Sequence, residues 1–209
     1  LILAPTRELA IQVATAFHSY GHHSAISVLA VYGGQPYERQ IRRLQRGVDV
    51  VVGTPGRLLD LMRQNALDLS AVRTVVLDEA DEMLSMGFIE DIETILSETP
   101  ETRQTALFSA TLPAEIRRLA ERYLRQPQSV RIGSSHVTVD ALAQRYYLVH
   151  EADKLAALSR LFEVEEISSA LVFARTRAAT GELASDLTAR GFPAEALNGD
   201  MSQEAREQV

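Results

Sequence analysis

Short apolar runs alternate with longer amphipathic segments along the 209-residue chain, and this alternation constrains the fold more than any other feature. The apolar runs are rich in Val, Leu and Ile, which is typical of strands that are covered on both faces. Strands that alternate with helices favour right-handed βαβ crossovers. The sequence therefore predicts an α/β fold in which helices flank a parallel sheet.

The pattern places both kinds of element along most of the chain. The predicted strands are Ile26–Tyr32, Val48–Val52, Arg73–Leu77, Thr105–Phe108, Ser129–Arg131, Arg145–Val149, Ala170–Phe173 and Ala194–Leu197. The predicted helices are Arg7–Tyr20, Tyr37–Arg46, Gly56–Gln64, Ile89–Glu98, Ala114–Arg125, Ala152–Phe162 and Arg177–Arg190, and a further helix is expected to begin at Ser202.

A polar segment, Gly133-Ser134-Ser135-His136, interrupts the alternation and is typical of a linker. We expect a first domain over 1–132, a linker over 133–140, and the N-terminal part of a second domain over 141–209. The last segment is too short for a complete sheet domain. Because the chain begins at Leu1 without an initiator Met, we expect it to be an excerpt from a longer protein.

Composition excludes several classes of protein. The chain has no Cys, which excludes a disulfide scaffold, a thiolate zinc site and a Cys nucleophile. No apolar run approaches about 18 residues, so we expect no membrane span. The 28 acidic residues outnumber the 21 basic ones, which argues against nucleic-acid binding through bulk charge but leaves a local basic patch open.

Two carboxylates directly follow the predicted strand that ends at Leu77, in the run Asp78-Glu79-Ala80-Asp81. Open α/β sheets bind ligands at the carboxyl edge of their strands. In phosphoryl-transfer sites an Asp at this edge holds Mg²⁺, usually through water, and the next Glu can orient or deprotonate an attacking water. The alternative interpretation is a solvated strand-to-helix turn with Asp81 as the N-cap.

Further motifs occur in order around this run. They are Pro5-Thr6-Arg7-Glu8-Leu9, Gly33-Gly34, Thr54-Pro55-Gly56-Arg57 and Ser109-Ala110-Thr111. With the Asp-Glu-Ala-Asp run, the set resembles the DEAD-box family of ATP-dependent RNA helicases, in its bacterial-type members. Leu171–Arg177 and Asn198–Arg206 resemble motifs of the family's second domain, although a His commonly stands in place of Asn198.

The resemblance implies a RecA-like first helicase domain that lacks its N-terminal P-loop part, followed by the start of a second RecA-like domain. It also implies ATP and Mg²⁺ as cofactors, RNA as the partner and a cytoplasmic location. The single lysine, Lys154, has no glycines beside it, so the 209 residues hold no P-loop. The Arg-finger motifs are expected beyond Val209, and we therefore expect the excerpt alone to be inactive.

The expected roles follow the motifs. The catalytic set comprises Glu79 as the base, Asp78 as the water-mediated Mg²⁺ ligand, and Asp81, Ser109 and Thr111. The resemblance implies that Ser109 and Thr111 bond toward Asp81 and couple the nucleotide site to RNA handling. The alternative is that these two hydroxyls cap the helix near Pro113.

The expected RNA-binding groups lie on both parts of the chain. Arginine donates charge-assisted hydrogen bonds to phosphate, and glycine lets the backbone approach a nucleic-acid strand closely. The resemblance implies an RNA channel formed by Pro5, Thr6, Arg7, Gly33, Gly34, Thr54, Pro55, Gly56 and Arg57, with Thr176 and Arg206 on the second part. The alternatives are a helix capped by Thr6 and an ordinary strand-to-helix turn at Thr54.

Three functions stay open at this point. The first is an RNA helicase that couples ATP hydrolysis to local opening of a duplex. The second is a non-catalytic module that binds the RNA backbone or docks a partner. The third is a two-domain motor that acts on DNA or works as a translocase. Contacts between arginine and phosphate do not distinguish RNA from DNA, whereas contacts to the 2′-hydroxyl do.

Overall fold

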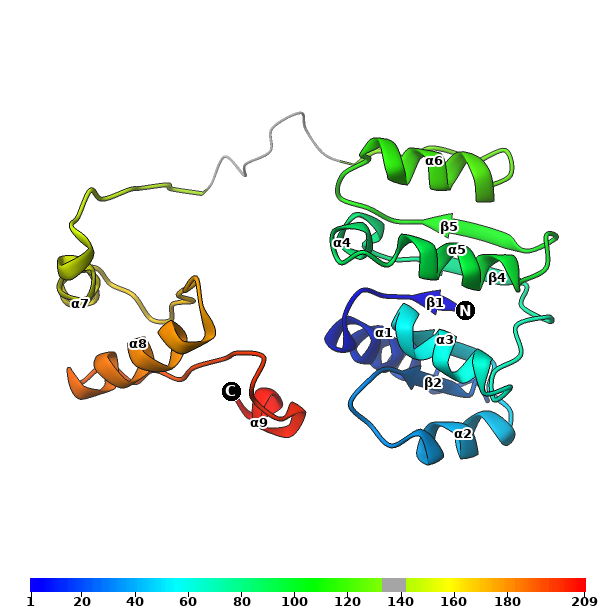
Figure 1. Ribbon diagram of the computed structural model, residues 1–209, viewed down its shortest axis with the longest axis horizontal. Helices are drawn as coiled ribbons and strands as arrows, with labels where there is room; N and C mark the ends of the chain where they lie inside the picture. The colour runs from blue at the N-terminus through cyan, green and yellow to red at the C-terminus, as the bar shows by residue number, and fades with distance from the viewer. Residues whose placement is uncertain (133–141) are drawn as a thin grey trace. The chain divides into compact units, whose positions relative to one another are not determined.

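The computed structural model describes residues 1–132 and 142–209, apart from the side chains of residues 203, 204 and 207. The predicted linker at 133–140 lies outside the described residues. Contacts divide the chain into two units, Leu1–Arg131 and Ile132–Val209 (Figure 1).

A parallel sheet of five strands forms the centre of the first unit. The strands are β1 (Ile2–Leu3), β2 (Val28–Val31), β3 (Val50–Gly53), β4 (Thr74–Leu77) and β5 (Gln104–Leu107). Their order across the sheet is β2-β3-β1-β4-β5, and every pairing is parallel. In the middle strand, Leu3 pairs with Gly53 on one side and with Leu77 on the other.

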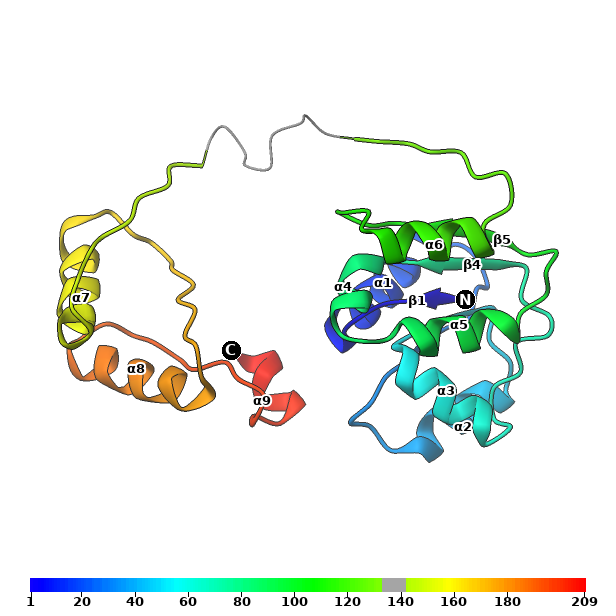
Figure 2. The same ribbon diagram turned by 45° about the horizontal axis from the view of Figure 1, so that its top comes forward.

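Helices cover both faces of this sheet (Figure 2). In chain order they are α1 (Arg7–Tyr20), α2 (Tyr37–Gln45), α3 (Pro55–Arg63), α4 (Ala80–Ser85), α5 (Ile89–Ser97) and α6 (Ala114–Tyr123). Successive strand residues point to opposite faces. Ile2 therefore packs in a cluster with Ala10 and Ala14 of α1, whereas Leu3 packs in the cluster that holds Leu58 of α3. The predicted parallel sheet flanked by helices is confirmed.

All the regular secondary structure among the described residues of the second unit is helical. The helices are the 3₁₀ helix η1 (Glu151–Asp153), α7 (Lys154–Val164), α8 (Arg177–Ala189) and α9 (Gln203–Gln208). The rings of Phe162 and Phe192 lie 5.4 Å apart between centroids, and Arg190 donates to the Ser159 hydroxyl at 3.3 Å. These contacts join α7 to the C-terminal end of α8.

Four predicted strands are wrong. Ser129–Arg131, Arg145–Val149, Ala170–Phe173 and Ala194–Leu197 form no strand. Local apolar character favours extended backbone, but a strand also requires a hydrogen-bonded neighbour, and no ladder forms at these segments. Their large side chains are accordingly exposed, as at Leu148 and Phe173.

Two elements of the first unit were not predicted, namely β1 and α4. The two residues of β1 are too few to show a periodicity, and the six residues of α4 begin within the Asp-Glu-Ala-Asp run. The predicted helices of the first unit agree with the observed ones to within two residues at each end. No helix in the described part of the chain combines the length and apolar character needed to cross a bilayer.

Candidate functional site

The predicted motifs of the first unit gather at the carboxyl edge of its sheet. Pro5 follows β1, Gly33 follows β2, Thr54 follows β3, Asp78 follows β4 and Ser109 follows β5. Because all five strands are parallel, these positions share one edge, which is where open α/β sheets bind ligands. The fold therefore brings together segments that lie more than 100 residues apart.

The turn after β4 is fixed by backbone hydrogen bonds on two sides. The Asp78 amide donates to the Leu3 carbonyl at 3.0 Å, and the Ala80 amide donates to the Phe108 carbonyl at 3.0 Å. Between them, Glu79 has a left-handed backbone with φ 50° and ψ 53°. A residue with a side chain adopts this conformation at a cost of about 1–3 kcal/mol, so the surrounding bonds must hold it.

The two carboxylates of this turn differ in their environment. Asp78 is half-buried, and one of its oxygens accepts a hydrogen bond from the Glu79 amide at 3.0 Å. The Glu79 side chain is exposed, and no hydrogen bond to it is present among the described residues. A carboxylate held at the end of a buried strand and open to solvent is suited to accept a proton from water.

Asp81 and the segment after β5 form a compact hydrogen-bond network. One Asp81 carboxylate oxygen accepts from the Thr111 amide at 2.8 Å and from the Thr111 hydroxyl at 2.7 Å. The Ser109 hydroxyl accepts from the Asp81 amide at 3.2 Å and donates to the Thr111 carbonyl at 2.6 Å. The expected contacts from Ser109 and Thr111 to Asp81 are therefore present.

These hydrogen bonds stabilise the charged form of Asp81. Burial by itself raises the pKa of the Asp81 carboxyl, but hydrogen bonds from Thr111 and Ser109 outweigh it and lower this pKa from 3.8 to about 2. Asp81 is thus an anchor that stays ionised at neutral pH, and not a group that exchanges protons there.

Both capping alternatives at this edge are wrong. Helix α4 begins at Ala80 with Glu79 as its N-cap, so Asp81 lies inside the first turn. Helix α6 has Pro113 as its N-cap and no side-chain capping bond, so neither Ser109 nor Thr111 caps it.

A second cluster joins the start of α1 to the glycines after β2. Thr6 caps α1 by accepting a hydrogen bond from the Leu9 amide at 3.2 Å, which confirms the predicted capped helix. The next residue, Arg7, lies with its guanidinium against the backbone of Gly34. A Cβ built on Gly34 would lie 2.6 Å from Arg7 Nη1, and Gly34 has φ +87°. Only glycine meets both conditions without displacing Arg7.

The turn after β3 splits the predicted RNA-binding residues into open and buried ones. Thr54 is buried and serves as the N-cap of α3, with Pro55 in its first turn, as expected for a strand-to-helix turn. A Cβ on Gly56 would meet no atom within 4 Å, so the backbone there is open to an approaching strand.

Arg57 points into the protein. It is 8% exposed, and its Nη1 donates to the Gln35 carbonyl at 3.0 Å and to Gln40 Oε1 at 3.4 Å. Its guanidinium carbon lies 4.0 Å from the centre of the Tyr37 ring. Arg57 therefore supports the segment after Gly34. Sequence motifs alone did not indicate these partners, because Gln35, Tyr37 and Gln40 stand outside every recognised motif.

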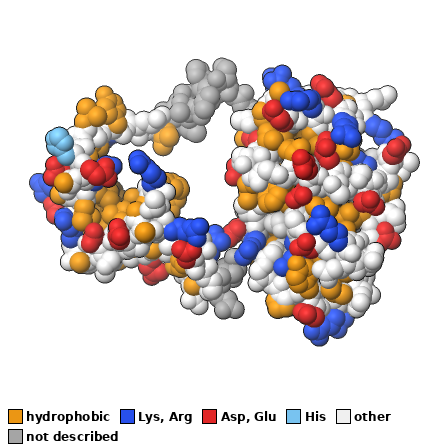
Figure 3. Space-filling view, viewed as in Figure 1, with side chains coloured by type: hydrophobic (Ala, Val, Ile, Leu, Met, Phe, Trp, Pro, Cys, Tyr) orange, Lys and Arg blue, Asp and Glu red, His pale blue; other side chains and the backbone are white. Residues whose placement is uncertain are grey.

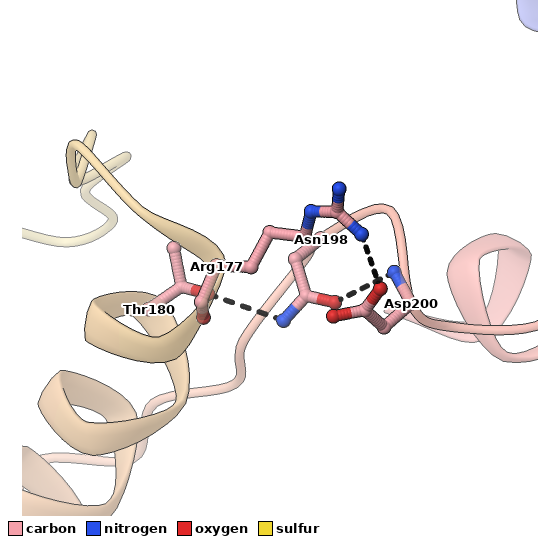
Figure 4. Close-up of polar contacts among 4 residues, drawn as sticks. All are labelled: Arg177, Thr180, Asn198 and Asp200. Carbon is pink, nitrogen blue, oxygen red and sulfur yellow. Dashed lines mark hydrogen bonds and ion pairs between the residues drawn. The ribbon is translucent and has the colours of Figure 1, made fainter.

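The predicted residues of the second unit lie around the start of α8 and in α9. Thr176 caps α8 by accepting from the Ala179 amide at 3.2 Å. The neighbouring Arg177 forms an ion pair with Asp200 (Figure 4). Arg206 lies in α9, whose N-cap Ser202 accepts from the Ala205 amide at 3.2 Å.

Asn198 ties the segment before α9 to α8. Its amide nitrogen donates to the Thr180 hydroxyl at 3.1 Å, while its side-chain oxygen accepts from the Asp200 amide at 3.1 Å. Figure 4 shows both contacts beside the ion pair of Arg177 and Asp200. An asparagine thus connects two elements at the position where the family commonly has a His.

The carboxyl edge fits a magnesium ion that is held mainly by water and phosphate. The described residues contain no group of three or more His, Cys, Asp or Glu side chains arranged to hold a metal. Mg²⁺ commonly keeps several waters and takes one or two carboxylates together with substrate phosphates. Asp78, half-buried and with only one oxygen engaged by the Glu79 amide, meets that requirement.

Comparison with known proteins identifies the class to which this arrangement belongs. The family model for the DEAD/DEAH box helicase matches residues 1–119, and the chain therefore belongs to that family. A crystal structure of a DEAD box protein from the hyperthermophile Methanococcus jannaschii aligns with a TM-score of 0.61 and 42% identity, over 100% of this chain and 56% of that one.

Two curated relatives are similar over the whole chain. It is 52% identical to the ATP-dependent RNA helicase DeaD of Escherichia coli K12, over 100% of this chain and 33% of that protein. It is 50% identical to the DEAD-box ATP-dependent RNA helicase CshA of Geobacillus kaustophilus, over 99% of this chain and 44% of that protein. The chain thus spans less than half the length of either relative.

Proposed function

We propose that this chain is part of an ATP-dependent RNA helicase that locally unwinds or remodels RNA duplexes in the cytoplasm. The observation that carries the proposal is the network of Asp81, Ser109 and Thr111 at the same sheet edge as the turn of Asp78 and Glu79. Names of the relatives support the same activity, since both are described as ATP-dependent RNA helicases.

In the proposed reaction Glu79 orients the attacking water and accepts its proton. Its exposed carboxylate follows a buried strand, and the left-handed backbone at Glu79 is fixed by the bonds on either side of it. Asp78 would hold Mg²⁺ through water, and the ion would neutralise charge that develops on the transferred phosphoryl group. Asp81 holds the segment after β5 against the turn after β4 through its hydrogen bonds with Thr111.

The RNA strand is proposed to pass along the segments after β1, β2 and β3. Arg7 offers a guanidinium to a phosphate, and Gly33, Gly34 and Gly56 offer backbone that a strand can approach. Such contacts engage the RNA backbone, so little sequence specificity is expected. Arg57 acts on this surface through Gln35 and Gln40, while Pro5, Thr6, Thr54 and Pro55 position the two helix starts.

Thr176 and Arg206 are proposed as phosphate contacts of the second unit, which we assign to a second RecA-like domain. Thr176 stands at the start of α8, where backbone amides and a hydroxyl are suited to an anion. We propose that residues 1–132 form part of the first RecA-like domain and that residues 141–209 form the N-terminal part of the second.

The non-catalytic module differs from the helicase in one observable sequence feature. The 209 residues contain no G-x-x-x-x-G-K-[ST] run, and phosphoryl transfer depends on the positioning that such a loop provides. The decisive sequence is therefore that of the encoding frame upstream of Leu1. A P-loop in that upstream sequence would favour the helicase for the whole protein, and the non-catalytic module would then describe these 209 residues alone.

The test is nucleotide turnover by the protein translated from the whole encoding frame. Phosphate release from ATP is measured without nucleic acid, with single-stranded RNA, and with DNA of the same sequence. The proposal expects stimulation by RNA and little by DNA. Equal stimulation by DNA favours the DNA motor, and the absence of turnover from a protein that binds RNA favours the module.

A further inference from the structure

Four arginines form one face of α2 and its C-cap. Arg39, Arg42, Arg43 and Arg46 follow the spacing i, i+3, i+4, i+7, which places them along one side of a helix, and all four are exposed. We call these four residues the α2 arginine face. They line a surface hollow of about 360 Å³ together with Pro36 and Glu38.

The α2 arginine face is not neutralised by the protein. Among the described residues none of its four side chains forms an ion pair with a carboxylate, and Arg42 donates only to the Glu38 carbonyl at 3.2 Å. On α6, by contrast, Arg118 pairs with Glu115 and Arg122 pairs with Glu93. Like charges at i, i+4 destabilise a helix. An external anion bound to the α2 arginine face would therefore reduce the repulsion between these arginines.

This positive charge is concentrated against an acidic background. Residues Leu1–Ile132 contain 14 arginines and 16 acidic residues, whereas Glu38 is the one acidic residue lining the hollow. Figure 3 shows basic side chains at the edge of the first unit where Figure 1 places α2. The surface therefore has the local basic patch that bulk charge conceals.

The α2 arginine face is rigidly joined to the proposed RNA path. Helix α2 begins three residues after Gly34, and the Arg7 guanidinium lies against the backbone of Gly34. Gln40 donates to the Tyr32 carbonyl at 3.0 Å, and Arg57 donates to the Gln35 carbonyl at 3.0 Å. The first bond is buried and the second is partly buried, and together they hold α2 and the segment before it in place relative to Gly33 and Gly34.

We propose that the α2 arginine face binds phosphates of the RNA backbone and extends the RNA path beyond the recognised motifs. The face is about 10 Å long, since a helix rises about 1.5 Å per residue, and this length reaches more than one phosphate of a strand. Guanidinium groups donate paired hydrogen bonds that match phosphate oxygens. The inference rests on the proposed function, because it takes RNA as the polyanion.

The test measures how salt weakens RNA binding by this chain. A fluorescein-labelled single-stranded RNA of 20 uridines is titrated from about 50 to 300 mM KCl, and log K is plotted against log salt. The variant carries Arg39→Gln, Arg43→Gln and Arg46→Gln. Its matched control carries Arg117→Gln, Arg118→Gln and Arg122→Gln, which removes the same charge from exposed positions of α6.

Each lost phosphate contact lowers the slope by about 0.7 for single strands, so the α2 variant is expected to lose about 2 from the slope and the α6 control almost nothing. A triple Arg-to-Lys variant at the same α2 positions should keep most of the slope. Far-ultraviolet circular dichroism and urea midpoints confirm that every variant is folded.

Four outcomes overturn the inference. A loss below about 1 in the α2 variant, or equal losses in both triple variants, means that α2 makes no specific phosphate contact. Salt-insensitive RNA binding by the unmodified chain contradicts the proposed function as well, and this arm separates the two failures. If poly-glutamate binds the unmodified chain and loses affinity in the α2 variant while RNA does not, the partner is an acidic protein segment.

Discussion

The carboxylate of Asp81 accepts hydrogen bonds from both the amide and the hydroxyl of Thr111, 30 residues further along the chain, at 2.8 and 2.7 Å. The pair connects the end of β4 to the end of β5 through side chains. A backbone bond from the Ala80 amide to the Phe108 carbonyl runs parallel to it. These bonds hold the segment that follows β5 against the turn that follows β4.

The Asp81 network predicts a defined loss of stability in acid. The pKa of the Asp81 carboxyl is about 2 in the folded chain and near 3.8 when it is unfolded. Its stabilisation is therefore fully present above pH 4 and is lost as the pH falls toward 2. Urea unfolding should show Asp81→Asn to be about 1–2 kcal/mol less stable at pH 6, with the difference shrinking below pH 4.

The control for this prediction is Glu121→Gln, which alters an exposed carboxylate on α6 that has no hydrogen bond with the described residues. It should leave the unfolding free energy nearly unchanged at pH 6. A stability difference for Asp81→Asn that stays constant from pH 6 to pH 2.5 would show that the charge of Asp81 is not stabilised by its neighbours.

Gly34→Ala and Gly56→Ala should have opposite effects on stability. At Gly34 the added Cβ meets the Arg7 guanidinium at 2.6 Å on a backbone of φ +87°, so we expect a loss of about 1–2 kcal/mol. At Gly56, inside α3, the Cβ meets nothing within 4 Å, and a helical Gly-to-Ala change gains up to about 1 kcal/mol.

Measuring RNA affinity as well as stability then distinguishes a contact with RNA from an effect on folding at Gly56. If RNA backbone approaches Gly56 as proposed, Gly56→Ala weakens RNA binding while unfolding in urea requires more denaturant. RNA affinity of Gly56→Ala equal to that of the unmodified chain would remove Gly56 from the RNA path.

Arg57 is expected to contribute to the stability of the folded protein, although its motif predicts only an RNA-binding residue. Arg57→Ala leaves the Gln35 carbonyl and Gln40 Oε1 without their donor and removes the contact with the Tyr37 ring. We expect a loss of about 2–3 kcal/mol in urea unfolding. Arg63→Ala, at an exposed arginine of the same helix, should cost less than about 0.5 kcal/mol. Similar costs at both positions would contradict a structural role for Arg57.

The first unit was largely predictable because its signals are local. Apolar runs indicated β2 to β5, and Thr6 before Arg7 indicated the start of α1. The order of the strands was not predictable, since the pairing of Leu3 with both Gly53 and Leu77 joins residues that are distant in sequence. Within the site, the contacts of Ser109 and Thr111 with Asp81 were expected from their motifs, and both are present.

The remaining features depend on partners that no local pattern encodes. Arg57 appears in its motif as an RNA ligand, yet its burial is decided by Gln40 and Tyr37 of another helix. The apolar run Ala170–Phe173 favours a strand, but a strand requires a neighbour with free amides and carbonyls, and Phe173 is 88% exposed instead. The role of each site residue toward ATP or RNA stays a prediction.

The most direct test of the account is RNA-stimulated ATP turnover by the Glu79→Gln variant of the protein from the whole encoding frame. The substitution preserves size and removes the carboxylate proposed to accept the proton, so turnover should fall about 100-fold or more while ATP and RNA still bind. Glu82→Gln, at an exposed residue of α4, should keep turnover near that of the unmodified protein. RNA-stimulated turnover that survives Glu79→Gln would contradict the assignment of this carboxylate as the base.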